Sequence, residues 1–256
     1  MPMPLISFVL PVLLVATIKT VDVSCFFVAR YCYQYISFLD PDGVYLVVTI
    51  HHIAQAGVGL LLINLYARAN GLGFADFGFR KALFTRSIKP ILVFVSGWGA
   101  FQLIFTMVYV YALRRPLYNG YRFTVLNETA DFLFQITLSG TSEEILFRAM
   151  ILTIVLRYAN RRTKSRVPAA IAATAISTLI FMFDHVNFDL VPFRVTHLDI
   201  YQQLTCLVFS IFYSWLFMRY KSVYSVMLAH NLLNGLITII VLFIFMTWPI
   251  RLFAPG

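Results

Sequence analysis

The sequence predicts an all-α polytopic membrane protein of about seven or eight transmembrane helices with a polar site inside the membrane. Of its 256 residues, 60% are hydrophobic and only 12% are charged. Soluble globular chains have roughly 45–50% apolar and about 25% charged residues, so both values exclude that class. The apolar residues form stretches of about 20, the length that crosses a bilayer as a helix. No repeat or low-complexity tract divides the chain, so residues 1–256 are expected to form a single integral membrane domain.

Seven spans are predicted from these apolar stretches. They lie near residues 5–29, 44–67, 90–113, 132–156, 167–184, 200–218 and 223–248. Lys19, Asp22 and Arg30 interrupt the first stretch, so it is either one span or a span followed by an interfacial helix. A turn at residues 40–43 separates it from the second. Residues 71–89 are expected to form an amphipathic stretch at the membrane surface, with its aromatic side chains among the lipid headgroups.

Basic residues are concentrated in three loops that share one side of this map. They are Arg68, Arg80, Lys81, Arg86 and Lys89, then Arg157, Arg161, Arg162, Lys164 and Arg166, and finally Arg219 and Lys221. Short basic loops mark the cytoplasmic side, so the amino terminus is predicted to be cytoplasmic and the carboxyl terminus external. The net charge of +9 is then expected mainly to orient the chain in the membrane, and it also attracts anionic lipid headgroups of the bilayer. Nucleic-acid binding is not expected, because the basic residues do not gather on one soluble face.

Acidic residues are scarce, and Glu143 and Glu144 are adjacent within the apolar fourth stretch. A charged side chain at the centre of a membrane helix costs roughly 2.5–3.5 kcal/mol, so this pair requires compensation. Glu144 and Arg148 are four residues apart and share a helix face, which predicts an ion pair. Glu143 points about 100° away and has no partner in its own span, so we expect it to face a cavity. The alternative is a purely structural network of all three charges.

Two further spans contribute polar side chains. His185 follows Phe181 at the end of the fifth span, and His230 and Asn234 share one face of the last span. Histidine and asparagine often join membrane helices by hydrogen bonds, and a histidine at a span end can simply be solvated. Together with Glu143, however, these groups are the parts required to activate water and stabilise an oxyanion without a serine or cysteine nucleophile.

The remaining candidate polar residues are assigned to packing. Cys25, Cys32 and Cys206 lack the spacing of a metal finger or a disulfide framework, so we expect them to be reduced and buried. His51 and His52 are adjacent in the second span and point about 100° apart. They are expected to make separate packing hydrogen bonds rather than to bind one ligand.

Three motifs in these spans resemble a known family. Glu143-Glu144-x-x-x-Arg148, Phe181-x-x-x-His185 and His230-x-x-x-Asn234 are similar in residue type, order and spacing to the motifs of the CAAX prenyl protease and bacteriocin-processing family (CPBP, also called Abi) of intramembrane proteases. The motif-bearing core covers roughly residues 132–242. The resemblance implies an all-helical glutamate-type endopeptidase, independent of metal and cofactor, that hydrolyses a peptide bond within the membrane.

The resemblance also implies a role for each motif residue. Glu143 would activate water together with His185, whereas His230 and Asn234 would form the oxyanion site. Glu144 and Arg148 would hold the helix and polarise the site. The substrate would be a membrane-associated peptide or protein, prenylated or not. The membrane would be the plasma membrane of a prokaryote, or the endoplasmic reticulum membrane of a eukaryote.

Two other functions are compatible with the same residues. A zinc-dependent membrane protease could use Glu143, His185 and His230 as ligands with water as the fourth, although the chain has no HExxH motif. A non-catalytic immunity protein or a proton-coupled transporter could use the buried carboxylates for partner binding or coupling. No inverted repeat of the kind found in transporters is evident.

The span map places the motif histidines at different depths. At about 1.5 Å per residue, His185 lies roughly 27 Å along the fifth span and His230 only about 10 Å into the seventh, and these spans run parallel. Their meeting requires strong tilt, vertically offset helices or a re-entrant segment between Asp184 and Asp199. The family resemblance implies eight helices, which would also change these boundaries.

Overall fold

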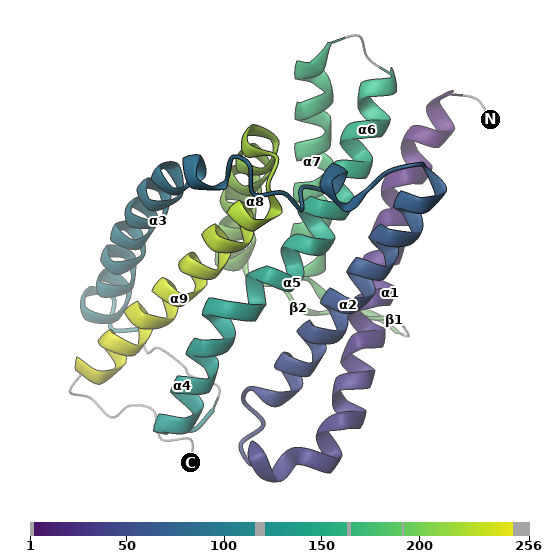
Figure 1. Cartoon of the computed structure of the whole chain (residues 1–256). Coiled ribbons are helices and arrows are strands. Elements are labelled where there is room, and N and C mark those ends of the chain that lie inside the picture. The colour runs from purple at the N-terminus through teal and green to yellow at the C-terminus, as the bar shows by residue number, and fades with distance from the viewer. Residues whose placement is uncertain (1–2, 116–120, 163–164, 191, 248–256) are drawn as a thin grey trace.

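The computed structural model describes residues 3–115, 121–162, 165–190 and 192–247, most of which are helical (Figure 1). The α-helices are α1 (Met3–Ile36), α2 (Leu46–Ala69), α3 (Phe84–Met107), α4 (Val125–Phe134), α5 (Gly140–Glu144), α6 (Thr153–Arg162), α7 (Arg166–Asp184), α8 (Ile200–Tyr220) and α9 (Val223–Thr247). Short 3₁₀ turns are η1 (Ser37–Leu39) and η2 (Phe74–Phe77), and wide π turns are η3 (Val108–Ala112), η4 (Gln135–Ser139) and η5 (Ile145–Leu152). One antiparallel hairpin pairs β1 (Asn187–Leu190) with β2 (Phe193–His197).

The predicted all-helical, polytopic membrane fold is confirmed. Among the described residues, six helices are long and apolar enough to cross a membrane, and they correspond to α1, α2, α3, α7, α8 and α9. The predicted fourth span is a continuous helical run from Val125 to Arg162 that η4 and η5 interrupt, which we call the irregular helix. The interfacial helix considered after the first span is absent, because α1 continues unbroken through Lys19, Asp22 and Arg30.

The connections between helices separate into two groups in space (Figure 1). The start of α1 and the α2–α3 and α8–α9 connections lie in the upper half of the view, as do the end of α6 and the start of α7. The α1–α2 connection, the end of α3 and the start of α4 lie at the bottom. The three basic loops therefore share one end of the molecule, as their sequence pattern predicts. We call it the basic end. Lys164 and residue 248 lie outside the described residues, and the cytoplasmic orientation of this end remains a prediction.

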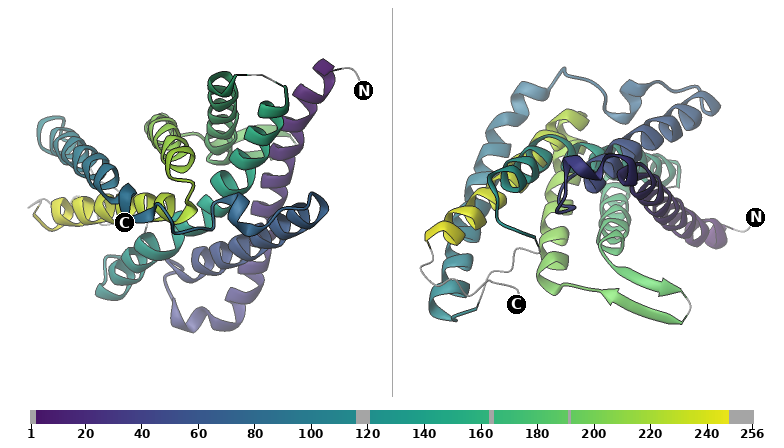
Figure 2. Two further views of the ribbon diagram at one scale, coloured as in Figure 1. Left: turned by 45° about the horizontal axis from the view of Figure 1, so that its top comes forward. Right: turned by 90° about the horizontal axis from the view of Figure 1, so that it is seen from below.

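The depth conflict between the motif histidines is resolved by helix placement. In Figure 1, α7 begins well above α9, and α9 runs obliquely across the bundle. The last turn of α7 therefore meets the early part of α9, and the rings of Phe181 and His230 lie 6.4 Å apart. Between α7 and α8 the chain forms the β-hairpin, which projects to one side (Figure 2). No re-entrant helix is needed between Asp184 and Asp199.

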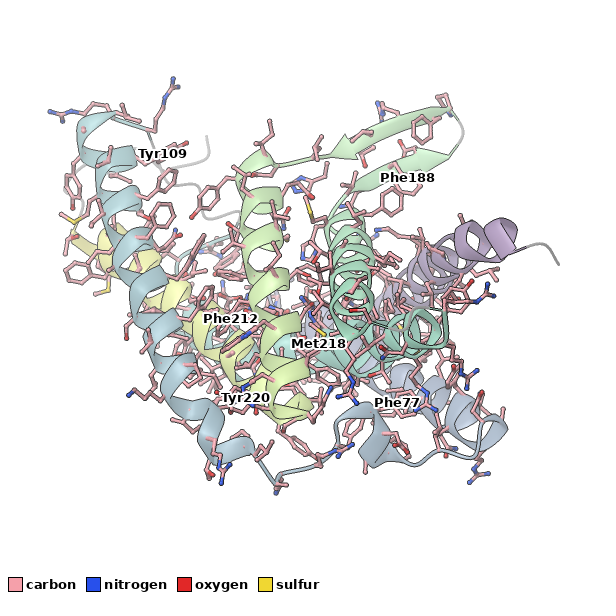
Figure 3. The ribbon with its side chains drawn as sticks, turned by 90° about the horizontal axis from the view of Figure 1, so that it is seen from above. Phe77, Tyr109, Phe188, Phe212, Met218 and Tyr220 are labelled. Atoms are coloured by element: carbon pink, nitrogen blue, oxygen red, sulfur yellow. The ribbon has the colours of Figure 1, made fainter. Side chains whose placement is uncertain are left out.

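The irregular helix lies at the centre of the core. All of its residues from Ile145 to Leu152 are buried, which is typical of a helical segment surrounded by protein on every side. Gly59 of α2 permits close approach, because a Cβ there would lie 2.9 Å from a methyl carbon of Leu146. Phe77 is fully buried beneath the α2–α3 connection (Figure 3). The expected placement of the aromatic residues of 71–89 among headgroups is therefore wrong for Phe77.

Two glycines of the α2–α3 connection allow a matched test of this packing. Both have positive φ, +64° at Gly71 and +84° at Gly78, but only at Gly78 would a Cβ collide, 2.5 Å from Phe217 Cε2. We expect Gly71→Ala to cost about 1–2 kcal/mol from backbone strain alone. Gly78→Ala should cost about 1–3 kcal/mol more because of overpacking. Thermal unfolding of the detergent-solubilised variants measures the difference, and equal melting temperatures would contradict the close contact.

Candidate functional site

A cavity of about 510 Å³ lies where the irregular helix, the end of α7, the start of α8 and the middle of α9 meet. Its polar lining residues are Gln135, Ser139, Glu143, His185, His197, Asp199, Tyr201, Gln202, Thr205, Cys206, His230, Asn234 and Thr238. Glu143, His185, His230 and Asn234, which the sequence predicts to act together, all line this one space. Two wide turns flank the segment that bears Glu143, and such turns are frequent at functional sites.

A fully buried ion pair lies behind the cavity wall. The Arg148 guanidinium donates to Glu144 Oε1 at 3.2 Å, and neither side chain has exposed surface. The same carboxylate oxygen accepts a hydrogen bond from His230 Nδ1 at 2.7 Å. The ion pair predicted from the i,i+4 spacing is therefore present, and the partner on α9 extends it into a network of three side chains.

Aromatic rings enclose this buried network. The Arg148 guanidinium lies 4.7 Å from the ring centroid of Phe181 and 5.1 Å from that of Tyr213. Tyr213 also stacks on the His230 ring, with centroids 5.0 Å apart and planes inclined by 29°. Cation–π contacts of this kind are worth about 2 kcal/mol or more when they are desolvated, so the rings offset part of the cost of burying the guanidinium. The sequence does not single out Tyr213, because a tyrosine in an apolar span usually contributes only to helix packing.

Glu143 lies in a different environment from its neighbour. Its side chain is 16% exposed and lines the cavity, and its Oε2 lies 3.8 Å from His230 Nε2. Within the described part of the chain this oxygen has no hydrogen-bond partner. His230 therefore stands between two carboxylates, with Nδ1 on Glu144 and Nε2 facing Glu143. Glu143 is the carboxylate of the pair that can reach a bound molecule.

The orientation of His185 is set by its own helix. Its Nδ1 lies 2.9 Å from the backbone oxygen of Phe181, a contact in which Nδ1–H donates to the carbonyl. Nε2 is then the ring nitrogen left to contact a molecule bound in the cavity. The Phe181 ring packs against the imidazole at a centroid distance of 4.7 Å. The buried free thiol of Cys206 interacts with the same imidazole and lines the cavity, so packing alone does not describe this cysteine.

Lys19 of α1 fixes the turn that contains His185. Its Nζ donates to the backbone oxygens of Asp184 at 2.7 Å and Val186 at 3.3 Å, which flank the histidine. It also pairs with the Asp184 carboxylate at 3.3 Å. In the sequence Lys19 was notable only as an interruption of the first span. Its partners are more than 160 positions away, so only the tertiary structure reveals the contact.

Close packing of α9 on the irregular helix brings the third motif to the cavity. Asn234 Nδ2 donates to Ser139 Oγ at 3.0 Å. One turn earlier, Asn231 Nδ2 donates to the Thr137 backbone oxygen at 3.1 Å. A Cβ at Gly140 would lie 2.6 Å from the Cβ of His230, so glycine is required for this approach. Ser139 and Asn231 were not predicted as site residues, because neither belongs to the motifs.

The adjacent histidines of α2 have separate partners, as predicted. His51 Nε2 lies 3.1 Å from Asp22 Oδ1, which links α2 to α1. His52 Nδ1 makes a short hydrogen bond to Ser142 Oγ, immediately before Glu143 in the chain. Its ring also packs edge-on against Phe134, with centroids 4.9 Å apart. His52 thus supports the segment that carries Glu143, although it belongs to a helix without a recognisable motif.

The cavity residues do not form a metal-binding group. In residues 3–115, 121–162, 165–190 and 192–247, no three histidine, cysteine, aspartate or glutamate side chains are grouped so that they could hold a metal ion. Glu143, His185 and His230, the ligands that a zinc protease would need, do not form such a group.

Part of the chain matches a known protein family. Residues 125–236 match the family model described as "Type II CAAX prenyl endopeptidase Rce1-like". The matched segment begins with α4 and ends within α9, so it contains all three motifs. Searches of curated proteins and of solved structures found no match for the chain. The resemblance noted from the motifs is therefore confirmed by an independent comparison.

The buried ion pair makes a quantitative prediction. Arg148→Met removes one charge and leaves the Glu144 carboxylate buried with only His230 as a partner, which should destabilise the protein by about 3–5 kcal/mol. The double variant Glu144→Gln/Arg148→Met removes both charges and should recover much of this loss. Thermal unfolding in one detergent measures both. A double variant as unstable as the single one would show that the charge pair does not cause the effect.

Proposed function

On the premise that residues 125–236 form a domain of the Rce1-like type II CAAX prenyl endopeptidase family, we propose that the chain is an intramembrane endopeptidase of the glutamate type. In this proposal Glu143 activates the water that hydrolyses the peptide bond. One observation carries it: the Glu143 side chain is 16% exposed and lines the cavity, with its Oε2 3.8 Å from His230 Nε2. Glu144, by contrast, has no exposed side-chain surface, and its Oε1 is paired with Arg148 and His230.

The first step is attack on the scissile carbonyl. Glu143 accepts a proton from water while the resulting hydroxide bonds to the carbonyl carbon, and Nε2 of His185 hydrogen-bonds to the same water and orients it. The carbonyl π electrons move to oxygen and give a tetrahedral oxyanion. Glu143 then delivers its proton to the leaving nitrogen as the C–N bond breaks. Protons and charge balance without a covalent intermediate on the enzyme.

His230 and Asn234 stabilise the oxyanion in this scheme. Nδ1–H of His230 is engaged by Glu144, so the imidazolium form presents Nε2–H to the cavity. One amide N–H of Asn234 binds Ser139, and the second is available as a donor. Donors fixed in a water-poor site are worth more than in bulk solvent, typically about 10²–10³ in rate for each donor. Glu144 and Arg148 act behind the wall, holding His230 in orientation and balancing its charge.

The substrate is a membrane-associated peptide or protein in this proposal. The cavity is polar at its centre and is enclosed by apolar helices, which suits a peptide bond delivered from a lipid environment. Whether a prenyl group contributes is a question for the assay. A farnesylated peptide ending in a CAAX sequence, compared with its unprenylated twin, separates prenyl recognition from peptide recognition under the same conditions.

Glu143→Gln is the decisive variant. It keeps the size and hydrogen-bonding capacity of the side chain but removes the base, so kcat for peptide cleavage by purified protein should fall by about 10²- to 10⁴-fold. The melting temperature should stay near that of the parent, because Glu143 is not part of the buried ion pair. Full activity in this variant would refute the proposed mechanism.

Two controls separate the alternatives. Cys206→Ala should retain cleavage, because a cysteine nucleophile activated by His185 is not part of the mechanism; its inactivity in a folded variant would favour a cysteine protease. Treatment with a chelator should leave activity unchanged. Loss restored by zinc would instead favour the metalloprotease, and absence of cleavage for every peptide would favour a non-catalytic immunity protein or a transporter.

Lys19 should act as a positioning residue for the same reaction. Lys19→Met removes the contacts that hold the backbone on both sides of His185. A displacement of about 1 Å at a catalytic group can cost roughly 10²-fold, so we expect kcat to fall 10- to 100-fold with little change in KM. Lys19→Arg, which can still donate to the carbonyl oxygens, should recover part of the rate.

A second variant separates positioning from charge balance. Lys19→Met/Asp184→Asn neutralises both members of the ion pair but still lacks the donors to the backbone oxygens. Its kcat should remain as low as that of Lys19→Met. Recovery of full activity in the double variant would show that Lys19 merely compensates the Asp184 charge.

A further inference from the structure

A second, smaller cavity lies at the basic end of the molecule, and no motif residue lines it. Its volume is about 200 Å³, and its walls come from the α2–α3 connection, α6, the end of α8 and the turn into α9. The lining residues are Asp76, Gly78, Arg80, Thr153, Leu156, Arg157, Asn160, Phe217 and Lys221. We call this cavity the basic pocket. Phe77 and Tyr220 are neighbours in the sequence of residues that line this pocket. Figure 3 shows both toward the same edge of the molecule.

Positive charge converges on the basic pocket from separate parts of the chain. Arg80, Arg157 and Lys221 line it, against one carboxylate, that of Asp76. Asp76 Oδ2 is already engaged, because it accepts a hydrogen bond from the backbone N–H of Gly73 at 2.9 Å. In the described part of the chain, none of these three cations has a carboxylate oxygen within the 4.0 Å of an ion pair. The local excess of positive charge is therefore uncompensated by protein.

The cations also repel one another. Lys221 lies in the turn between α8 and α9, outside the spans. Burial lowers the pKa of its ammonium group, and the neighbouring charges of Arg80 and Arg166 lower it further. An anion bound between these side chains would relieve that repulsion.

Backbone contacts fix the walls of the pocket, although Arg80 and Lys221 themselves are exposed. The Gly78 backbone oxygen accepts a hydrogen bond from the N–H of Val223 at 2.8 Å, which attaches the α2–α3 connection to the start of α9. Arg80 Nε and Nη2 both donate to the Ala75 oxygen, at 2.9 and 2.6 Å, so this guanidinium is fixed on one edge. Lys221 adopts a left-handed backbone conformation with φ of 51°, which is rare for a residue other than glycine. Such conformations persist where surrounding contacts impose them.

We propose that the basic pocket binds the phosphate group of an anionic phospholipid. Guanidinium groups match phosphate oxygens in geometry as well as charge, and Lys221 adds a point charge. The orientation of the chain in the membrane explains why these loops are basic, because cytoplasmic loops are rich in Lys and Arg. It does not explain why three of the cations line the same pocket. The pocket lies at the basic end, beside the turn between α8 and α9, and anionic lipids are enriched in the cytoplasmic leaflet, to which the basic loops assign this end. A free phosphate ion offers the same chemistry and is the alternative source.

The test is a binding titration on purified full-length protein in neutral detergent. The probes are dihexanoyl phosphatidylglycerol, dihexanoyl phosphatidylcholine and inorganic phosphate. We expect saturable binding of phosphatidylglycerol that is clearly tighter than that of the other two. Each cation removed should weaken binding about fivefold, so Arg157→Gln/Lys221→Gln should raise Kd about 25-fold.

A matched variant controls for net charge. Arg86→Gln/Lys89→Gln removes two exposed cations from the same end of the molecule, outside the pocket, and should leave Kd nearly unchanged. Asp76→Asn keeps an acceptor for Gly73 but removes the opposing charge, so it should tighten binding. Equal weakening by the two double variants would overturn the site in favour of diffuse surface attraction. Inorganic phosphate binding as tightly as the lipid would overturn the lipid as the occupant, and absence of saturable binding would overturn the proposal.

Discussion

The structure depends on one buried carboxylate oxygen. Oε1 of Glu144 accepts hydrogen bonds from both Arg148 and His230, and it thereby joins the irregular helix to α9 in the interior of the bundle. Without these donors the charge would be too costly to bury, so the oxygen and its two partners have to assemble together. The same contacts decide which nitrogen of His230 faces Glu143. Burial of one glutamate thus determines how its neighbour is presented to the cavity.

The helices without motifs support this centre from the other side. α1 reaches the turn around His185 through Lys19, and α2 reaches the residue before Glu143 through His52. Both supporting side chains are ionisable groups in otherwise apolar spans, and each finds its partner on the motif-bearing segment. Membrane helices cannot rely on hydrophobic driving force between them, so hydrogen bonds and close packing such as that at Gly140 fix their relative positions.

Sequence reasoning identified the spans, the shared side of the basic loops and the Glu144–Arg148 ion pair, because hydropathy and helical spacing are local properties. It also placed Glu143 in a cavity, from the cost of an unpaired carboxylate. It missed Lys19, Tyr213 and Cys206, whose contacts join positions distant in the chain. The meeting of His185 with His230 depends on the offset and tilt of α7 and α9, which tertiary packing sets. The β-hairpin was missed as well: apolar Phe188, Leu190, Phe193 and Val195 do alternate with polar residues, but the two strands are only four and five residues long.

The contact made by Lys19 has a consequence for how the chain divides. The family-matched segment, residues 125–236, holds all of the motif residues but neither α1 nor α2. The amine that fixes the turn around His185 and the imidazole that supports Ser142 both come from the preceding part of the chain. A fragment that begins at Val125 would therefore contain every motif residue but would lack the Lys19 and His52 side chains that hold the motif-bearing segment in place. The part of the chain that positions the proposed catalytic groups therefore includes α1 and α2 as well as the family-matched residues 125–236.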